Sequence, residues 1–170
     1  IQAKLHLKYL SMTIIQANHE KATLISSLAL ELCQKSQSSE IQAEYYNLVG
    51  LFKIKQQHFE EAKSLLMEGL NFSEKAQDDL IKSYLFLNLG HLYSILQDVK
   101  TSTKFQYMCL ELAQQRTDLR LEMIVLANMA YNKILQKDYE ASVTFSKQAE
   151  VLAEKVDEKR FRAAIKGNLG

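Results

Sequence analysis

Residues 45–70 read YYNLVGLFKIKQQHFEEAKSLLMEGL, and this stretch decides the fold. Its apolar residues recur three or four positions apart, which is the spacing of one face of a helix. The polar segment 56–58 interrupts the pattern, so one helix ends there and a second begins. The apolar faces of the two helices comprise Ile41, Tyr45, Leu48, Val49 and Phe52, then Phe59, Ala62, Leu65, Leu66, Gly69 and Phe72. The stretch therefore predicts a helical hairpin.

The hairpin recurs with a period of 40 residues. Small residues return at three positions of the repeat. The first position holds Gly50, Gly90, Ala130 and Gly170, the second holds Ala22, Ala62, Ser102 and Ser142, and the third holds Ala29, Gly69, Cys109 and Ala149. Apolar and amide positions return as well, including Tyr9, Val49, Leu89, Met129 and Leu169, and Asn88, Asn128 and Asn168. Small side chains are required where the helices of a hairpin cross closely. Each hairpin alone would expose an apolar flank, so neighbouring repeats must stack.

The composition agrees with an all-α fold. The chain has no proline and five glycines among 170 residues, so the turn residues of a strand-rich fold are missing. We expect an α-solenoid of stacked antiparallel hairpins with a right-handed superhelical course. Residues 1–170 should form a single domain, with repeats at 1–40, 41–80, 81–120 and 121–160 and a partial fifth at 161–170. Helices are expected near 1–16, 19–36, 41–56, 59–76, 80–96, 99–116, 120–136, 139–156 and 160–170.

Charge and hydropathy exclude several classes of protein. A net charge of +1 argues against a dedicated nucleic-acid binder. No apolar run approaches the roughly 18 residues that a membrane span needs, and no secretory signal precedes the repeats. Two cysteines suit a reducing compartment. These features predict a cytoplasmic protein without nucleic-acid or membrane partners.

The sequence carries no recognisable catalytic, cofactor or metal motif. The four histidines, His6, His19, His58 and His91, lack a zinc-binding spacing. Both cysteines occupy small-residue positions, which suits packing better than nucleophilic chemistry. The acidic pairs 60–61 and 78–79 fall at helix starts, where they favour the helix dipole. We therefore expect no enzyme activity, no cofactor and no metal.

The second repeat resembles the tetratricopeptide (TPR) motif. The resemblance is carried by segments 46–50, 58–62 and 69–70, and the third and fourth repeats match with Asn88-Leu89-Gly90 and Asn128-Met129-Ala130. The usual TPR period is 34 residues with a closing proline, whereas this chain has 40 and none. The longer form is similar to repeats of Rap-type phosphatases, peptide-pheromone regulators and TPR-containing signalling proteins. A HEAT-like array of similar period is the alternative fold.

The resemblance implies that the first helix of each hairpin lines a concave groove. The matching positions would bind a protein or an extended peptide, and they are Asn47, Leu51, Tyr84, Leu87, Asn88, His91, Ile124, Asn128 and Tyr131. The cationic residues with which chaperone-binding TPRs hold a terminal carboxylate are absent from these positions. In an alternative interpretation, the recurring asparagines join one hairpin to the next, and the convex face with Lys104 and Lys147 does the binding.

The resemblance implies a binding scaffold within a larger intracellular protein. The alternative is a regulatory segment of a kinase, cyclase, transcription regulator or Rap-type phosphatase whose output domain lies outside this chain. The partial repeat 161–170 would expose Phe161, Ile165 and Leu169 without a second helix to cover them. We expect either self-association through this end or further repeats in the parent protein.

Overall fold

The computed structural model describes residues 2–156, and they are 87% helical without a strand. Eight helices follow one another, namely α1 (Gln2–Ile15), α2 (His19–Ser36), α3 (Ser39–Lys55), α4 (Phe59–Ala76), α5 (Asp79–Ile95), α6 (Val99–Gln115), α7 (Leu119–Leu135) and α8 (Tyr139–Lys155). The prediction of an all-α array of hairpins is confirmed, and these helices begin and end within two residues of the expected bounds. The expected ninth helix, 160–170, lies outside the described residues. None of the described helices combines the length and apolar character needed to cross a membrane.

Polar side chains between the helices cap the helix starts. Ser38 and Asp118 each accept a hydrogen bond from the backbone N–H three residues later. Asp78 accepts two such bonds, from the N–H groups of Leu80 and Ile81, both at 3.0 Å. These bonds satisfy donors that a helix start otherwise leaves unpaired.

The turns between helices depend on a backbone conformation that the sequence does not predict. Seven non-glycine residues have φ between 51° and 63°, and they are Ala17, Gln37, Gln57, Gln77, Gln97, Thr117 and Lys137. Each is the left-handed residue that closes a helix, a place where glycine is the usual choice. After α6, Thr117 N–H donates to the carbonyl of Gln114 and Asp118 N–H to that of Ala113. Helix ends here are therefore specified by packing and hydrogen bonds rather than by glycine.

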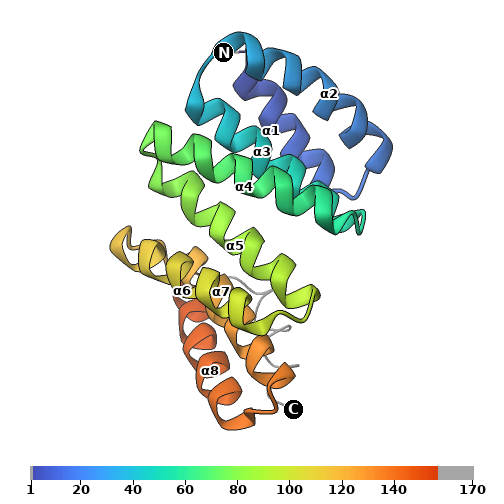
Figure 1. Ribbon diagram of the computed structural model, residues 1–170. Helices are drawn as coiled ribbons and strands as arrows, with labels where there is room; N and C mark the ends of the chain where they lie inside the picture. Colours follow the sequence, from blue (N-terminus) through green and yellow to red (C-terminus); the bar gives the residue numbers. More distant parts are fainter. Residues whose placement is uncertain (1, 157–170) are drawn as a thin grey trace. The chain divides into compact units, whose positions relative to one another are not determined.

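Packing groups the helices into two units, residues 1–88 and 89–170, with the boundary inside α5. Each unit is described by itself. Figure 1 shows α1–α2 and α3–α4 as antiparallel hairpins in the first unit, and α7–α8 in the second. A single domain with a right-handed superhelical course stays a prediction.

Unit 1 has an apolar core between its two hairpins. Helix α3 packs against both α1 and α2. The buried residues of this core include Leu7, Leu10, Tyr45, Val49 and Phe52. The small-residue positions are confirmed as packing sites, because Ala22, Ala29 and Ala62 are wholly buried.

Two glycines of unit 1 are contact points between helices. A Cβ on Gly50 would lie 2.6 Å from Cδ2 of Leu66, and one on Gly69 would lie 2.7 Å from Cδ2 of Leu85. A real Cβ is not found so close to another carbon. A hydrogen at each position therefore lets α4 approach α3, and α5 approach α4.

Unit 2 has a buried polar network where unit 1 has apolar residues. Asn132 donates from Nδ2 to Ser102 Oγ at 2.7 Å and to Gln106 Oε1 at 3.0 Å, and its Oδ1 accepts from Ser94 Oγ at 2.6 Å. Ser102 also donates to the carbonyl of Gly90 at 2.7 Å. One repeat earlier, the positions of Asn132, Ser102, Gln106 and Ser94 are the apolar residues Leu92, Ala62, Leu66 and Ile54. The network joins α5, α6 and α7.

Replacing Ala62 with Leu tests the close helix crossing. Its side chain is wholly buried, so a larger one overpacks the hairpin and should lower the free energy of unfolding by about 1–3 kcal/mol. Ser64→Leu, on the exposed side of the same helix, should change it by no more than about 0.5 kcal/mol. Urea unfolding of both variants measures the difference, and equal midpoints would contradict the packing.

Thr117→Gly tests the left-handed turn after α6. A β-branched residue is strained at its φ of 55°, so glycine should raise the free energy of unfolding by about 1 kcal/mol. The matched control is Arg116→Gly, because Arg116 has a φ of −89°. Glycine there should destabilise by about 0.5–1 kcal/mol. Denaturant midpoints that shift in the same direction for both variants would refute the strain.

Ser102 and Ser142 occupy the same repeat position and should respond oppositely to alanine. Ser102→Ala removes two buried hydrogen bonds and should cost about 1–3 kcal/mol. The buried hydroxyl of Ser142 has no hydrogen-bond partner, so Ser142→Ala should be neutral or stabilise by up to about 1 kcal/mol. Thermal or denaturant unfolding gives both values, and equal losses would show that the network contributes nothing specific.

Candidate functional site

Two of the predicted groove residues form a hydrogen bond inside unit 1. Asn47 on α3 and Asn88 on α5 are both buried, and Asn88 Nδ2 donates to Asn47 Oδ1 at 2.8 Å. The bond connects the first helices of successive hairpins. This contact agrees with the interpretation in which asparagine joins one hairpin to the next, and it uses side-chain groups that a ligand would otherwise take.

The other predicted groove residues of unit 1 are apolar or aromatic and half-buried. Leu51 packs against the core formed by α1, α2 and α3. Tyr84 and Leu87 on α5 keep part of their surface accessible. The structure places these three on first helices as expected, and their role in binding stays a prediction.

In unit 2 the structure brings three predicted residues together. A cavity of about 280 Å³ is lined by His91, Ser94, Ile95, Gln106, Asn128 and Tyr131. His91, Ser94 and Ile95 come from α5, Gln106 from α6, and Asn128 and Tyr131 from α7. The fourth predicted residue of this unit, Ile124, packs instead against the core between α7 and α8.

Ser94 and Gln106 are cavity residues that sequence reasoning missed. The available signal was the change from apolar to polar at equivalent repeat positions, because Ile54 and Leu66 become Ser94 and Gln106. Both polar residues belong to the buried network of unit 2, which reaches the cavity through them. The network therefore fixes the helices that carry the lining residues.

The cavity lining is amphipathic. Ile95 and the half-exposed ring of Tyr131 supply apolar surface. The carboxamide of Asn128 can both donate and accept hydrogen bonds, as a peptide group requires. Among the residues that line the cavity there is no lysine, arginine, aspartate or glutamate. A buried charge is costly without a partner, and the lining has no lysine, arginine or carboxylate to pair with one.

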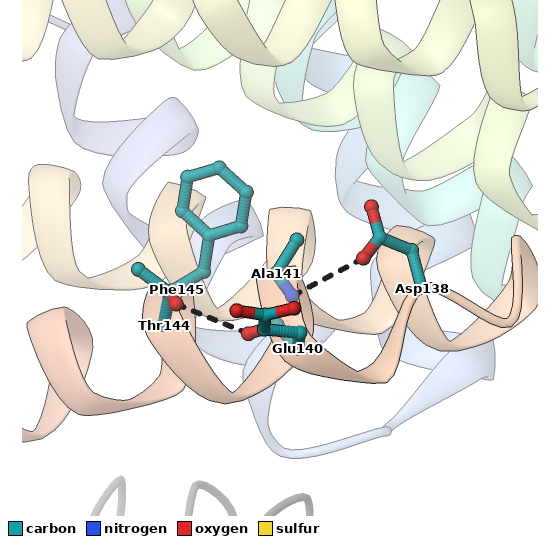
Figure 2. A pocket seen from close by; sticks show the side chains of 5 residues that line it. All are labelled: Asp138, Glu140, Ala141, Thr144 and Phe145. Carbon is teal, nitrogen blue, oxygen red and sulfur yellow. Dashed lines mark hydrogen bonds between the residues drawn. The ribbon is translucent and has the colours of Figure 1, made fainter.

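A second cavity, of about 320 Å³, lies at the start of α8. Figure 2 shows its lining residues and the two hydrogen bonds among them, from Ala141 N–H to Asp138 and from Thr144 Oγ1 to the carbonyl of Glu140. The bond from the Ala141 N–H, together with Lys133, lowers the pKa of Asp138. Its carboxylate is an N-cap and pairs with Lys133 at 3.2 Å, so the polar groups here already stabilise the helix start.

The two thiols have the environment of packing residues. Both cysteines are buried. Desolvation raises the pKa of Cys33 to about 11 and that of Cys109 to about 12. Because the thiolate is the nucleophilic and metal-binding form, both side chains are protonated and unreactive near neutral pH.

No family model matches this sequence. No curated protein matches it either. Solved structures do resemble it: BtubC (BKLC) from P. vanneervenii has a TM-score of 0.75 at 13% identity, over 95% of this chain and 70% of the other. PilF from Pseudomonas aeruginosa has a TM-score of 0.53 at 15% identity, over 96% of this chain and 88% of the other. Both are TPR-like helical repeat proteins, and this chain shares their fold.

Proposed function

We propose that this chain is a non-catalytic scaffold that binds an extended peptide of a partner protein, and that the cavity of unit 2 is its principal contact. The observation that supports the proposal is the convergence of His91, Asn128 and Tyr131 in one cavity. The sequence predicts all three as groove positions from their place in the repeat. The surrounding polar residues give the cavity a defined chemistry.

The buried network favours a binding role over simple packing. Apolar residues at Ser94, Ser102, Gln106 and Asn132 would build a core, as their equivalents do one repeat earlier. A buried polar network is demanding, because each unpaired group costs stability, but it fixes one arrangement of the helices. Departures from the apolar pattern of a core are expected at functional sites. Here the departure lies directly beside the cavity.

The lining residues indicate the character of the bound peptide. Tyr131 offers a large, half-exposed ring, and aromatic anchors often supply much of the binding energy. The Asn128 carboxamide can pair with both the N–H and the carbonyl of a peptide unit. The bound segment should therefore place an apolar side chain against Tyr131 and Ile95 and a backbone amide near Asn128. An acidic side chain would find no lysine or arginine in the cavity lining.

The test is to select peptides from a random-sequence library on the immobilised chain and to measure their affinity by calorimetry. Tyr131→Ala should weaken the selected peptides by about 1–2 kcal/mol, because it removes the aromatic contact. Lys104→Ala on the exposed side of α6 is the matched control in the same unit and should leave affinity unchanged. Circular dichroism should show equal helicity for both variants.

Two results would contradict the proposal. One is a loss of affinity on Lys104→Ala or Lys147→Ala with none on Tyr131→Ala, which would assign binding to the convex face. The other is a library that yields no binder to the folded chain under conditions in which a known peptide-binding TPR domain gives one.

A further inference from the structure

One polar group at the cavity of unit 2 is buried without a hydrogen-bond partner. Gln106 lines this cavity and is 1% exposed. Its Oε1 accepts a hydrogen bond from Asn132 Nδ2 at 3.0 Å, whereas its own Nε2 has no partner. An unpaired buried donor lowers stability, and such groups are few in folded proteins. The NH2 group of Gln106 is therefore a candidate for pairing with a ligand.

A backbone carbonyl at the other end of the network sets the orientation of this group. A carbonyl can only accept, so the hydroxyl proton of Ser102 goes to the Gly90 carbonyl, at 2.7 Å. The Ser102 oxygen must then accept from Asn132, which turns the Nδ2 of Asn132 toward it, at 2.7 Å. The second Nδ2 proton of Asn132 reaches Gln106, which must therefore present its oxygen to the network. Its NH2 group is left outside the network.

Reversing the Gln106 carboxamide does not pair its NH2 group. The reversed side chain would place Nε2 where Oε1 now lies, 3.0 Å from Asn132 Nδ2. Both groups are donors, so the contact would be repulsive. The Gly90 carbonyl thus leaves one NH2 group over in the network, and the residue that carries it borders the cavity.

The repeat position of Gln106 does not itself require an amide. One repeat earlier, the position is taken by Leu66, which is wholly buried. One repeat later it is taken by Ser146, whose buried hydroxyl also has no partner. Neither residue lines this cavity. An amide beside the cavity is therefore particular to the third repeat.

Ser94 supplies the complementary group in the same cavity. It also lines the cavity, and its one hydroxyl proton is used in the bond to Asn132 Oδ1. The Ser94 oxygen can therefore accept a further bond but cannot donate one. Ser94 and Gln106 bond to the two ends of the Asn132 carboxamide, its oxygen and its nitrogen. A ligand group that pairs with both needs an acceptor and a donor with the spacing of a carboxamide.

Charged side chains match this pair of residues only by half. A carboxylate could accept from Gln106 but has no proton for Ser94, and an ammonium group could donate to Ser94 but has no lone pair for Gln106. The lining also offers no lysine or arginine to a carboxylate, and no carboxylate to an ammonium group. A carboxamide matches both residues without carrying a charge.

We propose that the cavity of unit 2 takes the side-chain carboxamide of an asparagine or glutamine in the bound peptide, and that Gln106 selects it. The carbonyl oxygen of the ligand accepts from Gln106 Nε2, and its NH2 group donates to Ser94 Oγ. The half-exposed ring of Tyr131 stays available for the neighbouring apolar side chain. This inference rests on the proposed function, because it names a further side chain of the proposed peptide.

The first test is an NMR titration of the whole chain with butanamide, butyrate and butylammonium. The three molecules have the same carbon chain and end in a carboxamide, a carboxylate and a cation. Butanamide should shift the side-chain NH2 signals of Gln106, which are the signals that disappear in Gln106→Met. It should bind about tenfold more tightly than the other two, because each of them loses one buried hydrogen bond.

Two variants locate the binding of butanamide. Gln106→Met keeps the length of the side chain without the amide, and it should weaken butanamide by about tenfold. Ser146→Ala is the matched control, because it removes an unpaired buried hydroxyl at the equivalent position away from the cavity. It should leave butanamide binding unchanged. The titration of the unmodified chain needs neither variant to fold.

The second test uses the peptides selected from the random library. They should share a glutamine or asparagine at one fixed position. Replacing that residue with methionine should weaken binding to the unmodified chain by about tenfold. With Gln106→Met the same replacement should change affinity by no more than about twofold, because the partner group is already gone.

Several results would overturn the inference. Tighter binding of butyrate than of butanamide, equal binding of all three molecules, or binding of none would each do so. Peptides that depend on Tyr131 but share no asparagine or glutamine would overturn it and leave the proposed peptide site intact. Butanamide bound at Gln106, with no peptide selected from the library, would instead support it and contradict the proposed function alone.

Discussion

Close approach of neighbouring helices at positions without a large side chain is the constraint on which each unit depends. Gly50 lets Leu66 of α4 reach the backbone of α3, and Gly69 gives Leu85 the same access to α4. In unit 2, a Cβ on Gly90 would lie 3.0 Å from Cγ of Gln106. Because helix packing is set by which side chains interdigitate, these contacts fix the register of each helix against the next. The side chains that point outward from the first helices are positioned as a consequence.

The same crossing carries different chemistry in the two units. Leu66 in unit 1 is an apolar contact, whereas its repeat equivalent Gln106 in unit 2 bonds with Asn132. The exchange has a cost, because Nε2 of Gln106 is buried without a hydrogen-bond partner. An apolar core tolerates many substitutions, while a polar network demands particular ones. Unit 2 thus gives up some stability for a more specific arrangement of the helices around its cavity.

The sequence predicted the fold well because the two features that set the helix bounds, apolar spacing and polar residues between the helices, are local. Helix bounds follow from apolar spacing and from polar residues such as Ser38 and Asp118 at the joints. The left-handed residues could not be predicted, since Gln57 or Thr117 offers no preference for a positive φ. Their conformation is imposed by the helices on either side, which is a tertiary effect.

The candidate site was predicted less completely, because repeat position alone does not determine what a side chain contacts. Asn88 and Asn128 occupy the same repeat position, so the sequence predicts the same two alternative roles for both. One role is a hydrogen bond between hairpins, and the other is contact with a ligand. Asn88 is buried and donates a hydrogen bond to Asn47. This bond is possible because the second repeat has an asparagine at position 47. One repeat later, the pair of positions that corresponds to Asn47 and Asn88 is Leu87 and Asn128, and leucine has no side-chain acceptor.

The carboxamide of Asn128 instead borders the cavity with His91 and Tyr131. Two asparagines at the same repeat position thus differ in role because the residue at the partner position differs, asparagine at 47 and leucine at 87. A single substitution in a neighbouring repeat is enough to convert a structural amide into one that faces a cavity. This is how an array of near-identical hairpins can acquire a binding site without any change in its fold.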